Sequence, residues 1–189
     1  MRPLVTVSGT PVAPGRPSAE DDPLSTAGQT DGRSDAVTRV LGLAPRGVRS
    51  STVSLPRTAH HDGQAGFTGL LTENARRTGI AGCPGDDAQR WPAVHALDAA
   101  VLFRLVLEGA PGGSSRHVVA DEGVAVGDMA GLIGRRLGLP VEPVPEETFG
   151  PLGPVFATGQ SASSARTRAE LGWSPVRPGL LADLENLGA

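Results

Sequence analysis

The chain has 189 residues, 39% of them hydrophobic, and a formal net charge of −3. This length allows one domain with a substantial core, whereas the charge gives no electrostatic reason to expect a nucleic acid or an anionic membrane as a partner. The single cysteine excludes an internal disulfide, and no apolar run could span a bilayer or form a signal-peptide core, so we expect a cytoplasmic protein with no membrane partner.

The first third of the chain predicts a strand, a helix and a second strand. Residues 3–10 (PLVTVSGT) are mostly apolar and end in small hydroxyl residues, which is typical of a strand. Residues 11–32 are rich in Pro, Gly and Ser and predict a long loop. An amphipathic helix around Val37 follows, and residues 48–56 predict a β-branched strand closed by proline. This order indicates a parallel α/β sheet.

The rest of the chain alternates between weak strands and helices. Residues 98–108 are apolar nearly all round, which predicts a buried helix with Asp98 as its N-cap. Gly138 is placed to end an amphipathic helix. In order, we expect a loop at 57–66, a helix at 67–77, two short strands between 79 and 94, the helix at 98–108, a strand at 116–120, a helix at 127–140, an edge-type strand at 141–145 and two short helices at 163–173 and 178–187.

Glycines at positions 63, 66 and 69 have the spacing that opens a dinucleotide-binding helix. Such a turn must follow a buried strand directly, because backbone N–H groups and the helix N-terminus together hold the pyrophosphate. Here the expected strand ends at Leu55 and a loop intervenes. We therefore favour a simple loop over a phosphate-binding turn.

The histidines also allow two interpretations. Adjacent histidines in a loop point in different directions, and no His-x-x-x-His pair occurs on an expected helix, so we expect no metal site. His95 precedes the expected buried helix and could either form local hydrogen bonds or face a substrate. The residues weighed as metal ligands are His60, His61, Asp62, Cys83, His95 and His117.

Arg90 and Trp91 lie between a Gly-rich turn and the expected buried helix. An arginine here could bind a phosphate or carboxylate in bidentate fashion, with the tryptophan covering an apolar ligand face. Equally, the arginine could cap carbonyls and the tryptophan could fill the core. Ser8 and Thr10 end the first strand, where ligands of open α/β sheets bind. Ser8 lacks the Gly-x-Ser-x-Gly context of a hydrolase, which stays a distant third possibility.

Taken together, several segments resemble the extended, atypical short-chain dehydrogenase/reductases, and more narrowly the NAD-dependent epimerase/dehydratase family. They are PLVTVSGT, GVRSSTVSLPRTAHHDGQAGF, GDDAQRWPAVHALDAAVLFRLVLEGA, RHVVADEGVAVGDMAGLIGRRLGLPV and ARTRAELGWSPVRPGLLADLE. The most specific pieces are Arg90, His95 and Asp98, in an Arg-x-x-x-x-His-x-x-Asp pattern, and the late LGWSP. The resemblance covers nearly the whole chain but only the C-terminal portion of the family.

The resemblance implies the last strands of a Rossmann-like parallel sheet in residues 1–59 and a small α/β substrate-binding region in residues 60–189. It implies NAD or NADP as cofactor and a small-molecule substrate. Leu55, Pro56 and Thr58 would line the nicotinamide side. Ser8 resembles the catalytic Ser/Thr. The residues expected to face the substrate are Arg90, Trp91 and His95.

Two family features have no counterpart. The chain contains neither Tyr nor Lys, so the catalytic Tyr-x-x-x-Lys, expected near residues 31–39, is missing. The phosphate-binding turn and ribose-binding acid are also missing, and we expect a truncated chain or a misplaced start codon. Residues 3–10 would then expose an apolar strand edge, which predicts oligomers. The alternative function is a non-catalytic binding module or an inactive gene remnant.

Overall fold

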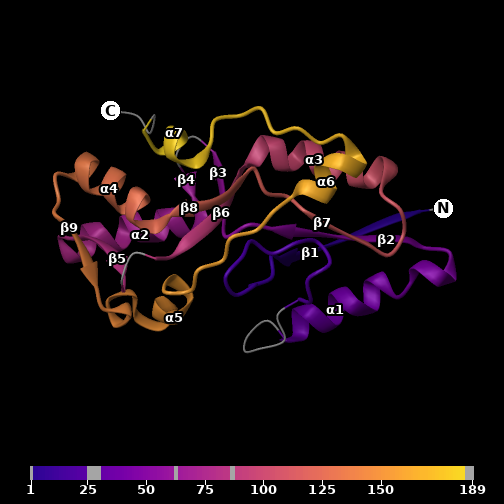
Figure 1. The fold of residues 1–189 in the computed structure, drawn as a ribbon, viewed down its shortest axis with the longest axis horizontal. Coiled ribbons are helices and arrows are strands. Elements are labelled where there is room, and N and C mark those ends of the chain that lie inside the picture. Colours follow the sequence, from indigo (N-terminus) through magenta and orange to yellow (C-terminus); the bar gives the residue numbers. More distant parts are fainter. Residues whose placement is uncertain (1, 25–30, 62–63, 86–87, 186–189) are drawn as a thin grey trace.

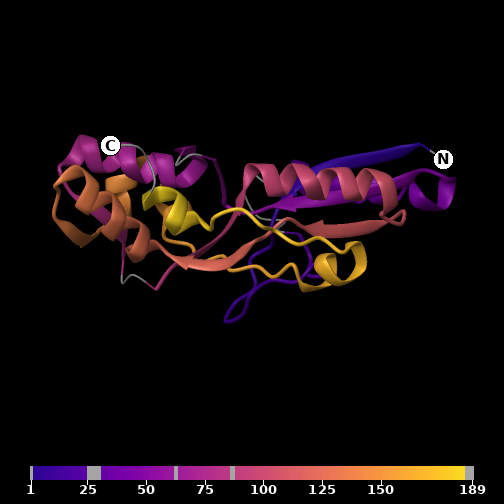
Figure 2. The same cartoon turned by 90° about the horizontal axis from the view of Figure 1, so that it is seen from above.

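A computed structural model describes residues 2–24, 31–61, 64–85 and 88–185 (Figure 1). It is a mixed α/β protein in which parallel strand pairs alternate with helices. The elements gather into two regions that lie side by side along the long axis of the molecule (Figures 1 and 2). None of the helices within the described residues is long and apolar enough to cross a membrane.

The first region is built on the parallel sheet β1-β2-β7. Helix α1 packs against β1 and β2 from one side, while α3 covers the other side (Figure 1). A short 3₁₀ helix, η2, leads into β2. The expected first strand, helix and second strand are thus confirmed. Their bounds are β1 Pro3–Gly9, α1 Asp31–Leu41, η2 Ala44–Arg46, β2 Arg49–Leu55, α3 Ala96–Gly109 and β7 Ser114–His117.

The second region contains the mixed sheet β4-β3-β6-β8 and the parallel pair β5-β9. In the mixed sheet β3 runs parallel to β6, while β4 and β8 are antiparallel to their neighbours. The strands and helices are β3 Thr58–His61, β4 Gln64–Ala65, α2 Gly66–Thr78, β5 Ala81–Pro84, β6 Arg90–His95, β8 Asp121–Ala125, α4 Val126–Leu137, β9 Val141–Val144, η3 Glu146–Leu152, α5 Gly153–Phe156 and α7 Leu180–Glu185. Helix α6, Ala165–Leu171, lies against α3 and β7 of the first region (Figure 1).

The expected loop at 57–66 is wrong, because this segment forms β3 and β4 and leads into α2. Thr58 and His60 are buried while Ala59 and His61 are exposed. This is the alternation of a half-buried strand, but polar residues occupy its inward positions. Pairing with β6 over the register Thr58–Ala93 supplies the partner that the local sequence does not reveal.

The expected N-cap of α3 is also wrong. The helix begins at Ala96, and the Nδ1 atom of His95 accepts a hydrogen bond of 3.2 Å from the backbone N–H of Leu97. Asp98 lies in the first turn and is buried; its carboxylate accepts hydrogen bonds of 3.1 and 2.9 Å from the backbone N–H groups of Val176 and Arg177. Asp98 therefore fastens the C-terminal segment to α3. By contrast, α4 is followed by Gly138 at φ 65°, the left-handed C-cap expected from the sequence.

Two hydrophobic clusters meet at β6. Its alternating side chains divide between them, with Trp91 and Ala93 in the cluster of the second region and Val94 in the cluster beneath α3. The first region adds Val53, Leu102 and Trp173 to the cluster beneath α3. β6 thus holds the two regions together from its interior.

Candidate functional site

The carboxyl ends of β1 and β2 meet at the junction of the two regions. The backbone N–H of Thr10 donates a 3.0 Å hydrogen bond to the carbonyl of Leu55, so the chain leaving β1 lies against the end of β2. Ser8 is 6% exposed, and Pro56 and Thr58 are buried just beyond Leu55. The structure therefore brings the expected catalytic serine and the expected cofactor-side loop to one edge of the sheet.

Ser8 belongs to a row of polar side chains across the sheet. It pairs in register with Ser54, which pairs in register with His117, so the three side chains share one face of parallel strands. The hydroxyl of Ser54 is buried with no hydrogen-bond partner. The Nδ1–H of His117 donates to the carbonyl of Ser163 at 2.9 Å, which leaves Nε2 with its lone pair. Burial lowers the pKa of His117, so the ring is neutral at pH 7.

Arg57 joins this edge to the second region. Its Nε and Nη2 atoms donate to Gln160 Oε1 at 3.0 and 2.7 Å, and Nη1 donates to the carbonyl of Val155. The guanidinium carbon lies 5.3 Å from the ring centroids of both Phe67 and Trp91. Burial lowers the pKa of Arg57 to about 10. A cation in this setting holds the loop after β2 in one place.

Gln160 completes the connection. Its side-chain amide donates to the carbonyl and to the hydroxyl of Thr10, the latter at 3.2 Å. Its backbone N–H donates to the carbonyl of Arg90 at 2.8 Å. Sequence reasoning did not select Arg57 or Gln160. Arg57 could have been noticed as a charged residue directly after the β-branched strand and its closing proline, whereas Gln160 lies in a segment of small residues that carries no signal.

Arg90 and Trp91 point to opposite faces of β6, as alternation requires. Arg90 is exposed, and its Nη1 donates to the carbonyl of Gly123 at 3.2 Å. Trp91 is fully buried, packs against Phe67 and Phe156, and donates its indole N–H to the carbonyl of Thr158 at 3.2 Å. In this structure Arg90 can reach a ligand from solvent, while Trp91 supports Arg57 from the core.

His95 is 6% exposed and caps α3, so it forms the local hydrogen bond that was one of its two expected roles. Burial, followed by the nearby His60, lowers the pKa of His95. The rings of His60 and His95 lie 5.4 Å apart, and Nδ1 of His60 contacts Asp183 Oδ2 at 2.7 Å. The described residues contain no group of three side chains able to hold a metal ion. Asp62, also weighed as a ligand, lies outside the described residues.

The glycine spacing at the start of α2 does not form a phosphate-binding turn within the described residues. Gly66 opens α2 directly after the two-residue strand β4, which is antiparallel to β3. A Cβ atom built on Gly69 would meet nothing within 4 Å, so no close backbone approach requires glycine there. Gly63 lies outside the described residues.

Comparisons with known proteins give related sequences and similar solved structures. No known family description matches the chain. An uncharacterized protein of Schizosaccharomyces pombe is 40% identical over 148 residues, covering 76% of this chain and 50% of the relative. An uncharacterized protein of Saccharomyces cerevisiae is 39% identical over 155 residues, covering 79% and 52%. The chain thus spans about half the length of these curated relatives.

Solved structures resemble the whole described fold. The dTDP-glucose 4,6-dehydratase of Streptomyces venezuelae with NAD and TYD bound aligns with a TM-score of 0.71 at 19% identity, over 97% of this chain and 59% of its own. The corresponding enzyme of Bacillus anthracis with NAD gives 0.73 at 14%, over 97% and 60%. RMD of Pseudomonas aeruginosa with NADPH gives 0.68 at 13%, over 98% and 64%. These likenesses show that the chain has a mixed α/β, Rossmann-like fold.

Proposed function

We propose that this chain forms the nicotinamide-facing and substrate-facing side of an NAD(P)-dependent oxidoreductase of the epimerase/dehydratase type. The observation that carries the proposal is the meeting of Ser8, Leu55, Pro56 and Thr58 at the carboxyl ends of adjacent parallel strands. Ligands of open α/β sheets bind at this edge. The fold likeness to NAD- and NADPH-bound enzymes supports the choice of cofactor.

The described residues fit one end of such a cofactor. Among the described residues the buried hydroxyl of Thr58 has no hydrogen-bond partner, so it could donate to a carboxamide or ribose. The backbone from Leu55 to Thr58 would lie along the nicotinamide side. The cofactor would supply hydride transfer. Ser8, Ser54 and His117 are the groups of this chain able to hold or pass a proton where other members use Tyr and Lys. Arg90 and His95 would contact the substrate.

Trp91 reports on this site, because Arg57 of the loop after β2 lies against its ring. Titration with NADH and with NADPH should therefore change the tryptophan emission in a saturable way. Trp173, which is buried beneath α3, provides the matched control: Trp173→Phe should keep the response and Trp91→Phe should lose it. A flat titration with both cofactors, or a response that persists in Trp91→Phe, would contradict the proposal.

A second function, a non-catalytic binding module, is favoured by the absence of Tyr and Lys from the sequence. It predicts no saturable response to either cofactor. Substrate turnover should separate the two functions further. In an active enzyme, Ser8→Ala should leave cofactor binding intact and abolish turnover, whereas a binding module has no turnover at all.

We further propose that β1 mediates self-association. Within the described residues β1 pairs on one side alone, with β2. Leu4 and Val7 on this strand are 40% and 42% exposed, and an unpaired apolar edge favours pairing with a second copy. Light scattering at tens of micromolar should show oligomers, and Val7→Lys should shift them to monomers. A monomeric starting protein would contradict the proposal.

A further inference from the structure

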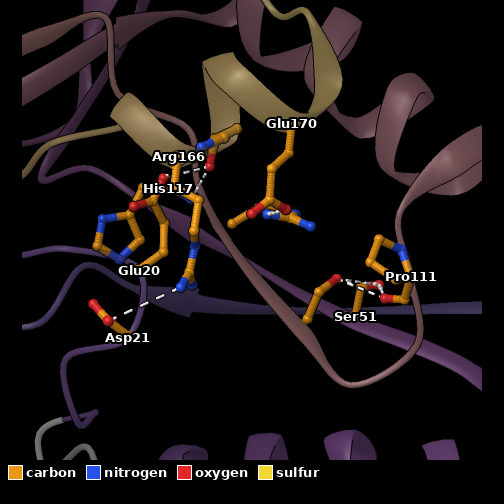
Figure 3. A network of polar contacts seen from close by, with 10 residues as sticks. Glu20, Asp21, Ser51, Pro111, His117, Arg166 and Glu170 are labelled. Carbon is orange, nitrogen blue, oxygen red and sulfur yellow. Dashed lines mark hydrogen bonds and ion pairs between the residues drawn. The ribbon is translucent and has the colours of Figure 1, made fainter.

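A second group of charged side chains surrounds a cavity at the outer edge of β7. The cavity has a volume of about 400 Å³ and lies between that strand, α6 and the segment after Ser18. Figure 3 shows Glu20, Asp21, Arg166 and Glu170 converging on it. None of these side chains contributes to the edge formed by Ser8 and the loop after β2. The polar side chains that line the cavity are those of Glu20, Asp21, Ser115, Arg116, Arg166 and Glu170.

Arg116 is the buried cation of this group. Its side chain is 2% exposed, and a guanidinium stays charged at every physiological pH, so it needs compensation. Nη1 contacts Glu170 Oε2 at 2.6 Å. The Nε atom is buried and has no hydrogen-bond partner among the described residues. The carboxylate of Glu170 thus compensates the charge of Arg116, while one N–H of the guanidinium stays unsatisfied.

Arg166 presents a second guanidinium from α6, on a side chain that is 40% exposed. Its Nε atom is also buried without a partner, and Nη1 lies 4.0 Å from Asp21 Oδ2, at the limit of an ion pair. The side chain of Asp21 is 75% exposed and that of Glu170 is 47% exposed. The pair between Asp21 and Arg166 is exposed on both sides and contributes little. Glu170 compensates the buried Arg116, so it can leave only when another anion takes its place. Both guanidiniums are thus paired with carboxylates that an incoming anion can displace.

Glu20 behaves differently from these two carboxylates. It is 5% exposed, and its Oε1 accepts hydrogen bonds of 2.8 and 2.7 Å from the backbone N–H and hydroxyl of Thr167. Its negative charge is therefore fixed in the cavity wall. This charge repels any anionic ligand, and it disfavours a doubly charged group more strongly than a singly charged one.

We propose that the cavity binds the carboxylate of a small organic acid, with Arg116 and Arg166 as its partners and Glu170 as the side chain that it displaces. Planar guanidiniums recognise carboxylates through paired N–H donors, and Ser115 adds a hydroxyl at the cavity wall. Glu170 then acts as an internal competitor that occupies Arg116 when no acid is bound. The inference does not depend on the proposed cofactor site.

NMR of the arginine Nε–H groups tests this proposal, since both are buried in the free protein. Acetate should give saturable shifts of the Arg116 and Arg166 signals, whereas chloride at the same ionic strength should not. Glu170→Gln should tighten acetate binding by up to about fivefold, because the competitor is removed. Arg166→Ala should weaken it. Glu108→Gln, at an exposed ion pair on α3, is the matched control and should change nothing.

Several results would overturn the proposal. They are equal shifts with chloride, no saturation with acetate, or unchanged affinity in Glu170→Gln. Inorganic phosphate binding more tightly than acetate would assign the cavity to phosphate groups and contradict the argument from Glu20. If Glu170→Gln fails to fold, Asp21→Asn removes the exposed carboxylate beside Arg166 and should likewise tighten binding; unchanged affinity there overturns the proposal.

Discussion

The two regions of the molecule bury different chemistry. β2, at the centre of the first sheet, buries Ser50, Ser51, Thr52 and Ser54 around a single valine. The second region buries Trp91 and Phe156 over aliphatic side chains, and the partly buried Phe67 and Phe149 pack against them. Hydroxyl groups contribute little net free energy to folding, whereas aromatic burial contributes much. The comparison indicates that the second region supplies stability and the first supplies polar groups for a site.

The largest expected effect comes from Trp91→Ala in the second region. Removing this fully buried ring should lower the free energy of unfolding by about 3–5 kcal/mol, because it leaves a cavity and takes away the support of Arg57. Urea unfolding followed by far-UV circular dichroism measures the change. A loss below about 1 kcal/mol would mean that the aromatic cluster does not dominate stability.

Asp98→Ala tests the fastening of the C-terminal segment to the first region. Two backbone N–H groups lose their acceptor, so we expect a loss of about 1–3 kcal/mol in the same measurement. Asp128→Ala is the matched control, because this residue is exposed in the first turn of α4 and should cost less than about 1 kcal/mol. Equal effects would show that Asp98 acts only through its helix.

We expect His95, at the junction of the two regions, to have a smaller effect on stability, and one that depends on pH. Its pKa is lowered from 6.5 in the folded protein, so the unfolded chain binds the proton more readily. Stability should be complete above pH 6.5 and fall as the pH drops below that value toward the folded pKa. His95→Asn keeps a capping side chain without a titrating ring and should reduce the slope below pH 6.5; the neutral, buried His117 should leave a residual slope. An unchanged slope would contradict this role.

The smallest effect is expected for Ser54→Ala. The hydroxyl is buried without a hydrogen-bond partner, so its removal should change stability by less than about 0.5 kcal/mol or increase it slightly. The hydroxyl of Ser51 contacts Ser114 Oγ at 3.2 Å, so Ser51→Ala should cost about 0.5–1.5 kcal/mol. If Ser54→Ala costs as much as Ser51→Ala, the polar row stabilises the first region.

The two regions also differ in how far the sequence predicts them. In the first, β1 and α1 follow from apolar patterning, β2 follows from its β-branched residues and the proline that closes it, and the expected catalytic role of Ser8 depends on a family resemblance. In the second, the sequence does not indicate the strand β3, because the polar residues Thr58 and His60 occupy its buried positions. The contact between Arg57 and Gln160 joins residues 103 positions apart, and no local pattern carries such a pairing.

β6 shows a further limit of sequence reasoning. Arg90 and Trp91 are adjacent, and each could face a ligand or serve the structure. Only pairing with β3 and β8 decides which face each side chain takes. The burial of Trp91 is therefore a result of tertiary packing. For His95 the two interpretations were a local hydrogen bond and a contact with a substrate. The structure shows the local hydrogen bond, in which Nδ1 caps α3, and the substrate contact stays a prediction.

Hydrogen exchange with and without saturating NADPH or NADH tests whether the carboxyl ends of β1 and β2 face the cofactor. We expect slower exchange at these ends, in peptides that contain Thr10 and Thr58, with no change over α4. No protection by either cofactor, or protection confined to other parts of the chain, would contradict the assignment of this edge as a cofactor-facing site.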